Sequence, residues 1–282
     1  MRRRRRDAGS ESLTLPCALH TAARRYCLEQ YAYWSKKYAE LAQARSDRQR
    51  DDPHRTREVL DTFPRYSVLD AIRIELERID PTTLTDLEDA RSLLVLAGQV
   101  ADNAFTQQPV GEIDARAVAE ERVAFCRYVG GLQGVDLHTV KPLPYRRVLT
   151  PQESKSIWSR LRARWELTDV WNAPMDGQLR GLMVFPAGGF YRAVADGQLR
   201  TMVLNRGIQR VWELREFGPE YVQDVSLFTP AFNGAEGYWS SEDLEWVVYA
   251  SHDGYVAVGG WLVAEVKALW HSSGLVWIDT RD

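Results

Sequence analysis

Cysteine is scarce in this 282-residue chain, which contains only Cys17, Cys27 and Cys126. The odd count excludes a complete disulfide framework, and the spacing matches no zinc motif. Few cysteines are typical of a reducing compartment, so we expect a cytoplasmic protein whose three cysteines are small core residues. A chain of this length can bury a sufficient hydrophobic core without metals or disulfides.

Long hydrophobic runs are absent as well. No stretch approaches the roughly 18 consecutive apolar residues of a transmembrane helix, so we expect no membrane partner. Residues 1–12 (MRRRRRDAGSES) lack the apolar segment of a secretory signal, and we predict a disordered basic tail there. The arginine run is also compatible with binding to nucleic acid or to an acidic protein. The net charge of -3 gives the whole chain no bias towards nucleic acid.

The common catalytic motifs are missing. The sequence contains no P-loop, no G-x-G-x-x-G, no H-E-x-x-H and no G-x-S-x-G. Its five histidines show no paired spacing, so we expect no metal site and no cofactor. These absences favour a non-enzymatic protein.

The first half of the chain has the apolar periodicity of amphipathic helices. We expect Ser67 to cap one of them and Asp80-Pro81 to end it. The polar stretch 45–58 interrupts the pattern and predicts a loop. Residues 13–140 are therefore predicted to form a helical bundle domain. Its helices are expected over 15–44, 67–80, 85–105 and 113–129.

Charge is distributed unevenly along this half. Residues 1–65 carry 15 Lys/Arg against 9 Asp/Glu, whereas residues 66–135 carry 6 against 12. The basic start and the acidic middle could present a charged surface to a partner, or could attract each other within the bundle.

The second half of the chain has the sequence features of β-strands instead of helices. Short β-branched and aromatic runs are bounded by Gly, Pro or Asp, which predicts an antiparallel sheet. Thr150-Pro151 with Glu153 forms a capping box at a helix start, and 261–270 has helical spacing. We therefore predict an α+β fold for the chain: an N-terminal helical bundle, then a C-terminal antiparallel sheet covered by helices over residues 141–282.

The stretch Ser251-His252-Asp253 contains the three residue types of a hydrolytic triad. Consecutive strand residues point to opposite faces, so Ser251 and His252 would face apart and no local triad would form. Asp253-Gly254 between two β-rich runs instead predicts a two-residue hairpin turn flanked by His252 and Tyr255.

A cluster of acidic and aromatic residues precedes this hairpin in the sequence, over residues 214–246. Carboxylates beside aromatics can hydrolyse glycosides, can bind a basic protein, or can simply form a solvated face over an aromatic core. "SSEDLEW" (240–246) also has the signature of a helix start. The candidate binding residues are Tyr221, Asp224, Glu236, Tyr238, Trp239, Asp243, Trp246 and His252.

The segments "FPRYSVLDAIRIELERIDP", "RVWELREFGPEY", "NGAEGYW" and "DLEWVVYASHDGYVAVGG" resemble an uncharacterised family of bacterial cytosolic proteins. The hairpin is similar to a strand pair of small bacterial immunity and toxin-neutralising proteins at Trp246, Tyr249, Ser251, His252, Asp253 and Gly259. This resemblance implies a defence-associated class of protein and assigns no catalytic site.

We therefore expect a non-enzymatic bacterial factor, immunity- or defence-associated, that binds a partner protein such as a basic toxin through an acidic and aromatic C-terminal surface. One alternative is a hydrolase that uses carboxylates or His252. Another is a nucleic-acid-associated factor that uses the basic N-terminus.

Overall fold

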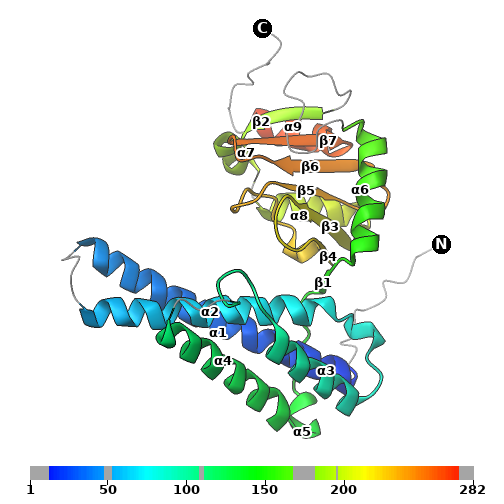
Figure 1. Cartoon of the computed structure of the whole chain (residues 1–282). Coiled ribbons are helices and arrows are strands. Elements are labelled where there is room, and N and C mark those ends of the chain that lie inside the picture. Colours follow the sequence, from blue (N-terminus) through cyan, green and yellow to red (C-terminus); the bar gives the residue numbers. More distant parts are fainter. Residues whose placement is uncertain (1–12, 48–52, 108–110, 168–181, 195, 273–282) are drawn as a thin grey trace. The chain divides into compact units, whose positions relative to one another are not determined.

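The structure is a computed structural model that describes residues 13–47, 53–107, 111–167, 182–194 and 196–272 (Figure 1). The chain divides into two compact units at Leu143/Pro144, and each is described here by itself. The predicted α+β class is confirmed, with helices first and a seven-stranded antiparallel sheet after them. Among the described residues, every helix is too short or too polar to cross a membrane.

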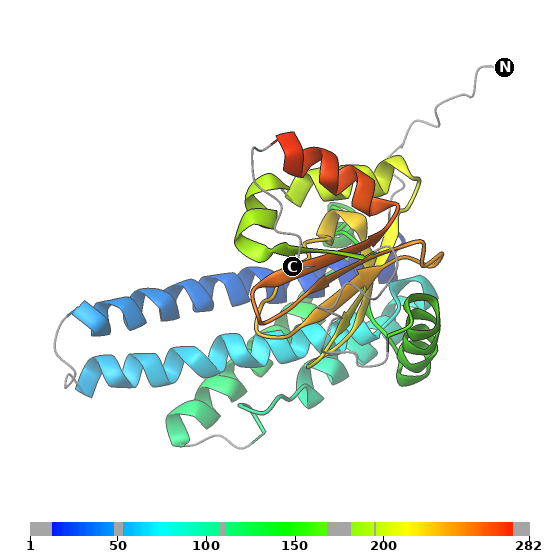
Figure 2. The same cartoon turned by 90° about the horizontal axis from the view of Figure 1, so that it is seen from above.

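The helical unit is built around two long helices, α1 and α2, which lie side by side in both views (Figures 1 and 2). Helices α3 and α4 pack against this pair and close a core that contains Leu19, Ile72, Leu94 and Phe125, all fully buried. The elements are α1 (Leu15–Asp47), α2 (Pro53–Arg78), the 3-10 turn η1 (Pro81–Thr83), α3 (Leu87–Val100), α4 (Glu112–Gly131) and α5 (Gly134–Leu137).

Two boundary predictions in this unit are wrong. Helix α2 begins at Pro53, so the polar stretch 45–58 is helical at both ends, and Ser67 lies buried in the middle of the helix instead of capping it. Proline suits the first turn of a helix because its missing N–H would have no partner there. The predicted end holds, because Asp80 caps η1 by accepting from the N–H of Thr82.

The second unit is a seven-stranded sheet in which all neighbours are antiparallel. The strand order is β1-β4-β3-β5-β6-β7-β2, so the short β1 and the strand β2 form the two edges. The strands are β1 (Arg146–Val148), β2 (Leu182–Pro186), β3 (Arg210–Arg215), β4 (Tyr221–Asp224), β5 (Gly237–Ser240), β6 (Trp246–Ala250) and β7 (Tyr255–Gly260).

Helices cover both faces of this sheet, as the views show (Figures 1 and 2). Strand β6 alternates between the faces: Trp246 and Val248 join the core under α7, α8 and α9, whereas Val247 and Tyr249 join the core under α6. Complete burial of β6 explains why its sequence is apolar throughout. The helices are α6 (Pro151–Trp165), α7 (Ala187–Ala193), α8 (Asp196–Asn205) and α9 (Leu262–Ser272), and the 3-10 turn η2 (Val225–Leu227) follows β4.

Of two helix starts that the sequence predicts in this unit, one is present and one is not. The capping box at Thr150 and Glu153 is present in α6 as predicted. The predicted helix start in 240–246 is wrong, because the segment is the turn between β5 and β6. Asp243 accepts hydrogen bonds from the Ser241 hydroxyl and from the N–H of Glu245, so the features of a helix cap serve a turn here.

Candidate functional sites

The β6–β7 hairpin carries the Ser-His-Asp sequence. The N–H of Ser251 donates to the carbonyl of Tyr255 over 3.0 Å, so these two residues flank a three-residue loop, His252 to Gly254. Gly254 has φ +79, the left-handed conformation that the last residue of such a loop requires. The hairpin is confirmed, but the predicted two-residue turn is wrong by one residue, since His252 lies inside the loop.

Glu236 joins this hairpin to the segment before β5. It precedes Gly237, which pairs with Ala250 at the end of β6, so its side chain reaches the hairpin loop. One carboxylate oxygen accepts from the Tyr249 hydroxyl. The other accepts from the Ser251 hydroxyl and the His252 N–H, both over 3.1 Å, and from Nδ1 of the His252 ring. The Glu236 side chain is 1% exposed, so this Glu236 clasp is a buried, fully satisfied carboxylate.

The protonation of the clasp follows from these contacts. Burial raises the pKa of the Glu236 carboxyl, but hydrogen bonds from Tyr249 and His252 outweigh burial and hold that pKa below its usual range. The hydrogen bond to Glu236, and then the charge of Asp253, raise the pKa of His252. Nε2 of His252 lies 3.2 Å from the Asp253 carboxylate, and the ring is largely exposed.

The geometry differs from that of a hydrolytic triad. A triad places the imidazole between the hydroxyl and the acid. Here the carboxylate of Glu236 lies between Ser251 and His252, because both side chains bond to it. The prediction that Ser251 and His252 face apart is wrong for a related reason: the strand ends at Ala250, so strand alternation does not apply to them. The arrangement can hold an imidazolium in place, and it bonds the Ser251 hydroxyl to a carboxylate instead of to the imidazole.

The predicted acidic and aromatic binding surface is not assembled as expected. Four of its aromatic side chains are at most 3% exposed, and Glu236 is equally buried, so these five belong to the interior of the unit. Asp224 and Asp243 lie at one end of the sheet, at the end of β4 and in the β5–β6 turn, whereas His252 lies at the other end. The four buried aromatics are Tyr221, Tyr238, Trp239 and Trp246.

The exposed apolar residues gather instead on the helical unit, which sequence reasoning missed. Of the fourteen large apolar residues that are exposed in the described part of the chain, ten lie before Leu143. Leu93, Leu96 and Val100 are 46%, 52% and 58% exposed, and their spacing of 3 and 4 places them along one face of α3. The predicted core positions Leu94 and Ala97 are indeed buried. The missed signal is that α3 has two adjacent apolar rows. One row, with Leu94 and Ala97, is buried, and the other, with Leu93, Leu96 and Val100, faces solvent.

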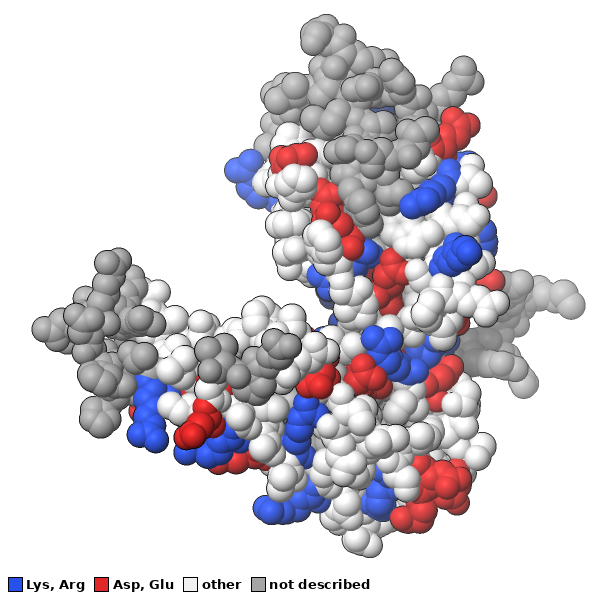
Figure 3. Space-filling view, viewed as in Figure 1, with Lys and Arg blue, Asp and Glu red and all other residues white. Residues whose placement is uncertain are grey.

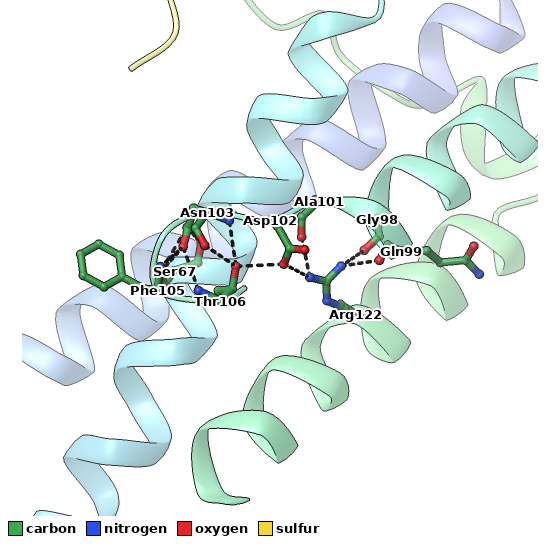
Figure 4. A network of polar contacts seen from close by, with 9 residues as sticks. All are labelled: Ser67, Gly98, Gln99, Ala101, Asp102, Asn103, Phe105, Thr106 and Arg122. Atoms are coloured by element: carbon green, nitrogen blue, oxygen red, sulfur yellow. Dashed lines mark hydrogen bonds and ion pairs between the residues drawn. The ribbon is translucent and has the colours of Figure 1, made fainter. Parts of the chain in front are cut away.

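The loop after α3 is held firmly by polar contacts (Figure 4). Arg122 of α4 donates to the carbonyls of Gln99 and Ala101 and to the Asp102 carboxylate, which satisfies the carboxyl end of α3. The Asn103 amide donates to the carbonyl of Ser67 over 2.9 Å. The network leaves the ring of Phe105 64% exposed, and this ring lies edge-on to Phe63 at 5.3 Å.

The charged groups around α3 are unequal in their exposure. Arg91 and Arg122 turn inward, with side chains 17% and 18% exposed, and donate to backbone carbonyls at helix ends. Asp86, Glu88 and Asp89 at the start of α3 are exposed, and Glu88 forms an ion pair with Arg91 at 3.4 Å. Figure 3 shows a largely uncharged area in the region of α3, with both acidic and basic side chains at its margin. We define the α3 surface as the exposed residues Leu93, Leu96 and Val100 together with the acidic residues Glu88 and Asp89.

Among the described residues, no group of three or more His, Cys, Asp or Glu side chains is arranged to hold a metal ion. No family model, no curated protein and no solved structure matches this chain.

Proposed function

We propose that the protein is a non-enzymatic binding factor that contacts a basic partner protein through the α3 surface. The observation that carries the proposal is the row of Leu93, Leu96 and Val100, about half exposed and rimmed by carboxylates. Isolated apolar side chains on a surface need no explanation, but a contiguous row on one helix face is typical of a protein contact.

Charge supports the choice of a basic partner. Residues 66–135 carry 12 acidic against 6 basic side chains, and three of the six arginines and two of the twelve carboxylates are turned inward. The groups left facing solvent near α3 are therefore mainly carboxylates, which attract a positively charged protein and suppress binding of an acidic one. The proposed contact keeps the basic partner expected from the sequence but moves it from the C-terminal unit to the helical unit.

A bacterial immunity or defence role is the narrower version of this proposal, in which the basic partner is a toxin. Its support is the resemblance of the hairpin and the acidic excess of residues 66–135. The hydrolase alternative stays a prediction with less support, because the Ser251 hydroxyl bonds to Glu236 and not to His252. The nucleic-acid alternative depends on residues 1–12, which lie outside the described residues.

The test compares the proteins that three immobilised baits capture from the native host: wild type, the double variant Leu93→Asp/Leu96→Asp, and Leu204→Asp. Leu204 lies in α8 and is 42% exposed, so it matches the α3 leucines in size and exposure. We expect one basic protein to bind wild type and Leu204→Asp, to be lost from the double variant, and to elute as salt is raised.

Capture that is equal on all three baits, or a retained partner that is acidic, would overturn the proposed contact. A toxin encoded beside this gene and captured in the same way would support the narrower version, and a captured basic protein without toxic activity would contradict it.

A further inference from the structure

The α+β unit has an open groove over Trp212 that the proposed function does not use. Trp212 on β3 and Val222 on β4 are paired across the two strands, and together they line two adjoining cavities of about 430 and 480 Å³. Each volume lies within the range of small-molecule sites. We call this pair of cavities the Trp212 groove.

Helix α6 and two turns form the walls. Gln152, Ser156 and Ile157 of α6 line the first cavity, together with Leu149 just before the helix. The second cavity is lined by the segment before Trp212 and by the β5–β6 turn. The segment contributes Gln209 and Arg210, and the turn contributes Ser241, Glu242 and Asp243. The groove therefore combines a partly exposed indole and aliphatic walls with amide, hydroxyl and carboxylate groups, and the carboxylates belong to Glu153, Glu242 and Asp243.

Arg160 lines the first cavity and bonds to Glu242, which lines the second. Its guanidinium is 5.4 Å from the centre of the Trp212 ring, and one of its nitrogens donates to the carbonyl of Glu242 over 2.6 Å. A guanidinium placed over an indole still has N–H groups in its own plane that can donate to an anion beside the ring.

The arginines around the groove differ in their partners. Arg147 donates to both carboxylate oxygens of Glu153, so its charge is balanced within the protein. Within the described residues, Arg160 and Arg210 form no ion pair with a carboxylate: the first bonds to a carbonyl and the second lies 3.8 Å over the Tyr145 ring. Two exposed guanidinium groups with spare donors therefore flank the indole.

We infer that the Trp212 groove binds a small ligand that has a flat apolar body and one anionic group. The flat body would stack on the indole and contact the aliphatic walls, and the anionic group would accept from Arg160 or Arg210. A carboxylate, sulfonate or phosphate satisfies the second requirement equally, because each offers two or more acceptor oxygens to a guanidinium. This inference stands on contacts separate from those of the α3 surface.

Naphthalene-2-sulfonate is the probe for a direct test, with 2-naphthol as its neutral counterpart. Isothermal titration of the full chain should give a dissociation constant of about 1 mM or tighter for the sulfonate, given the affinity usual for a ligand of this size. We expect roughly tenfold weaker binding of 2-naphthol, because the contact with the guanidinium is lost.

Two matched pairs of variants locate the binding. Arg160→Gln should weaken binding about tenfold, whereas Arg164→Gln, one turn further along α6, should not change it. Ser156→Tyr should block the groove from its exposed rim, whereas Ser159→Tyr, exposed on the same helix but outside the groove lining, should bind as wild type. Absence of binding to wild type at several times 1 mM, or equal losses in Ser156→Tyr and Ser159→Tyr, would overturn the inference.

Discussion

At the scale of single residues, Glu236 is the group on which the hairpin loop depends. Its carboxylate accepts from Tyr249, from Ser251 and twice from His252. Glu236→Gln keeps the shape but replaces one oxygen by an amide that cannot accept. A buried donor is then left unpaired, so we expect the free energy of unfolding to fall by about 3 kcal/mol in urea denaturation followed by tryptophan fluorescence.

The control is Glu245→Gln, which removes an exposed carboxylate from the β5–β6 turn at the other end of the sheet and should cost less than about 0.5 kcal/mol. The difference between wild type and Glu236→Gln should also depend on pH. The lowered pKa of Glu236 contributes stability above about 4.5 that is lost as pH falls through the folded value. The raised pKa of His252 contributes stability below about 6.5 that is lost as pH rises through the folded value. The difference should therefore be largest between these limits, and a difference independent of pH would contradict the clasp.

At the scale of elements, the start of α6 shows a local signal that acts as predicted. The Thr150 hydroxyl accepts from the N–H of Glu153, and the Glu153 carboxylate accepts from the N–H of Thr150. Thr150→Ala should lower the free energy of unfolding by about 1 kcal/mol, because a helix-end N–H loses its acceptor. Ser159→Ala, exposed later in α6, should change it by less than about 0.5 kcal/mol in the same urea denaturation. Equal effects of the two would contradict the capping role.

The elements also show where sequence reasoning stops. Features set by neighbouring residues were predictable: the α6 cap, the Asp80-Pro81 helix end and the Asp-Gly hairpin. Features set by distant residues were not. Ser67 is a residue type that often caps helices, yet it lies in the middle of α2. The apolar pattern of the helix continues before it, and its hydrogen-bond partner is Asn103, 36 residues away. The clasp was missed similarly, because Glu236 meets His252 only after β5 and β6 have paired.

At the scale of the whole molecule, the C-terminal unit buries its aromatic side chains, and the candidate binding surface therefore lies on the helical unit. The C-terminal unit contains nine of the ten tryptophans, which favoured it as the binding surface from sequence. A sheet covered on both faces has three layers to fill, so it buries residues such as Trp239 and Trp246 completely. Helix α3 packs against its bundle neighbours on one side only, so Leu94 is buried and Leu96 stays half exposed.

Each unit also has a core of its own. The helical core draws all its members from residues 13–140, and the two cores of the sheet draw theirs from residues 149–270. We therefore expect residues 13–143, produced alone, to be helical by circular dichroism and to unfold cooperatively on heating. Two leucines of α3 provide the control: Leu94→Asp places a charge in the core and should abolish the transition, whereas Leu96→Asp should preserve it. A gradual, non-cooperative melt of the unsubstituted fragment would show that its core is insufficient, and loss of the transition in Leu96→Asp would show that the α3 surface is needed for folding and not reserved for a partner.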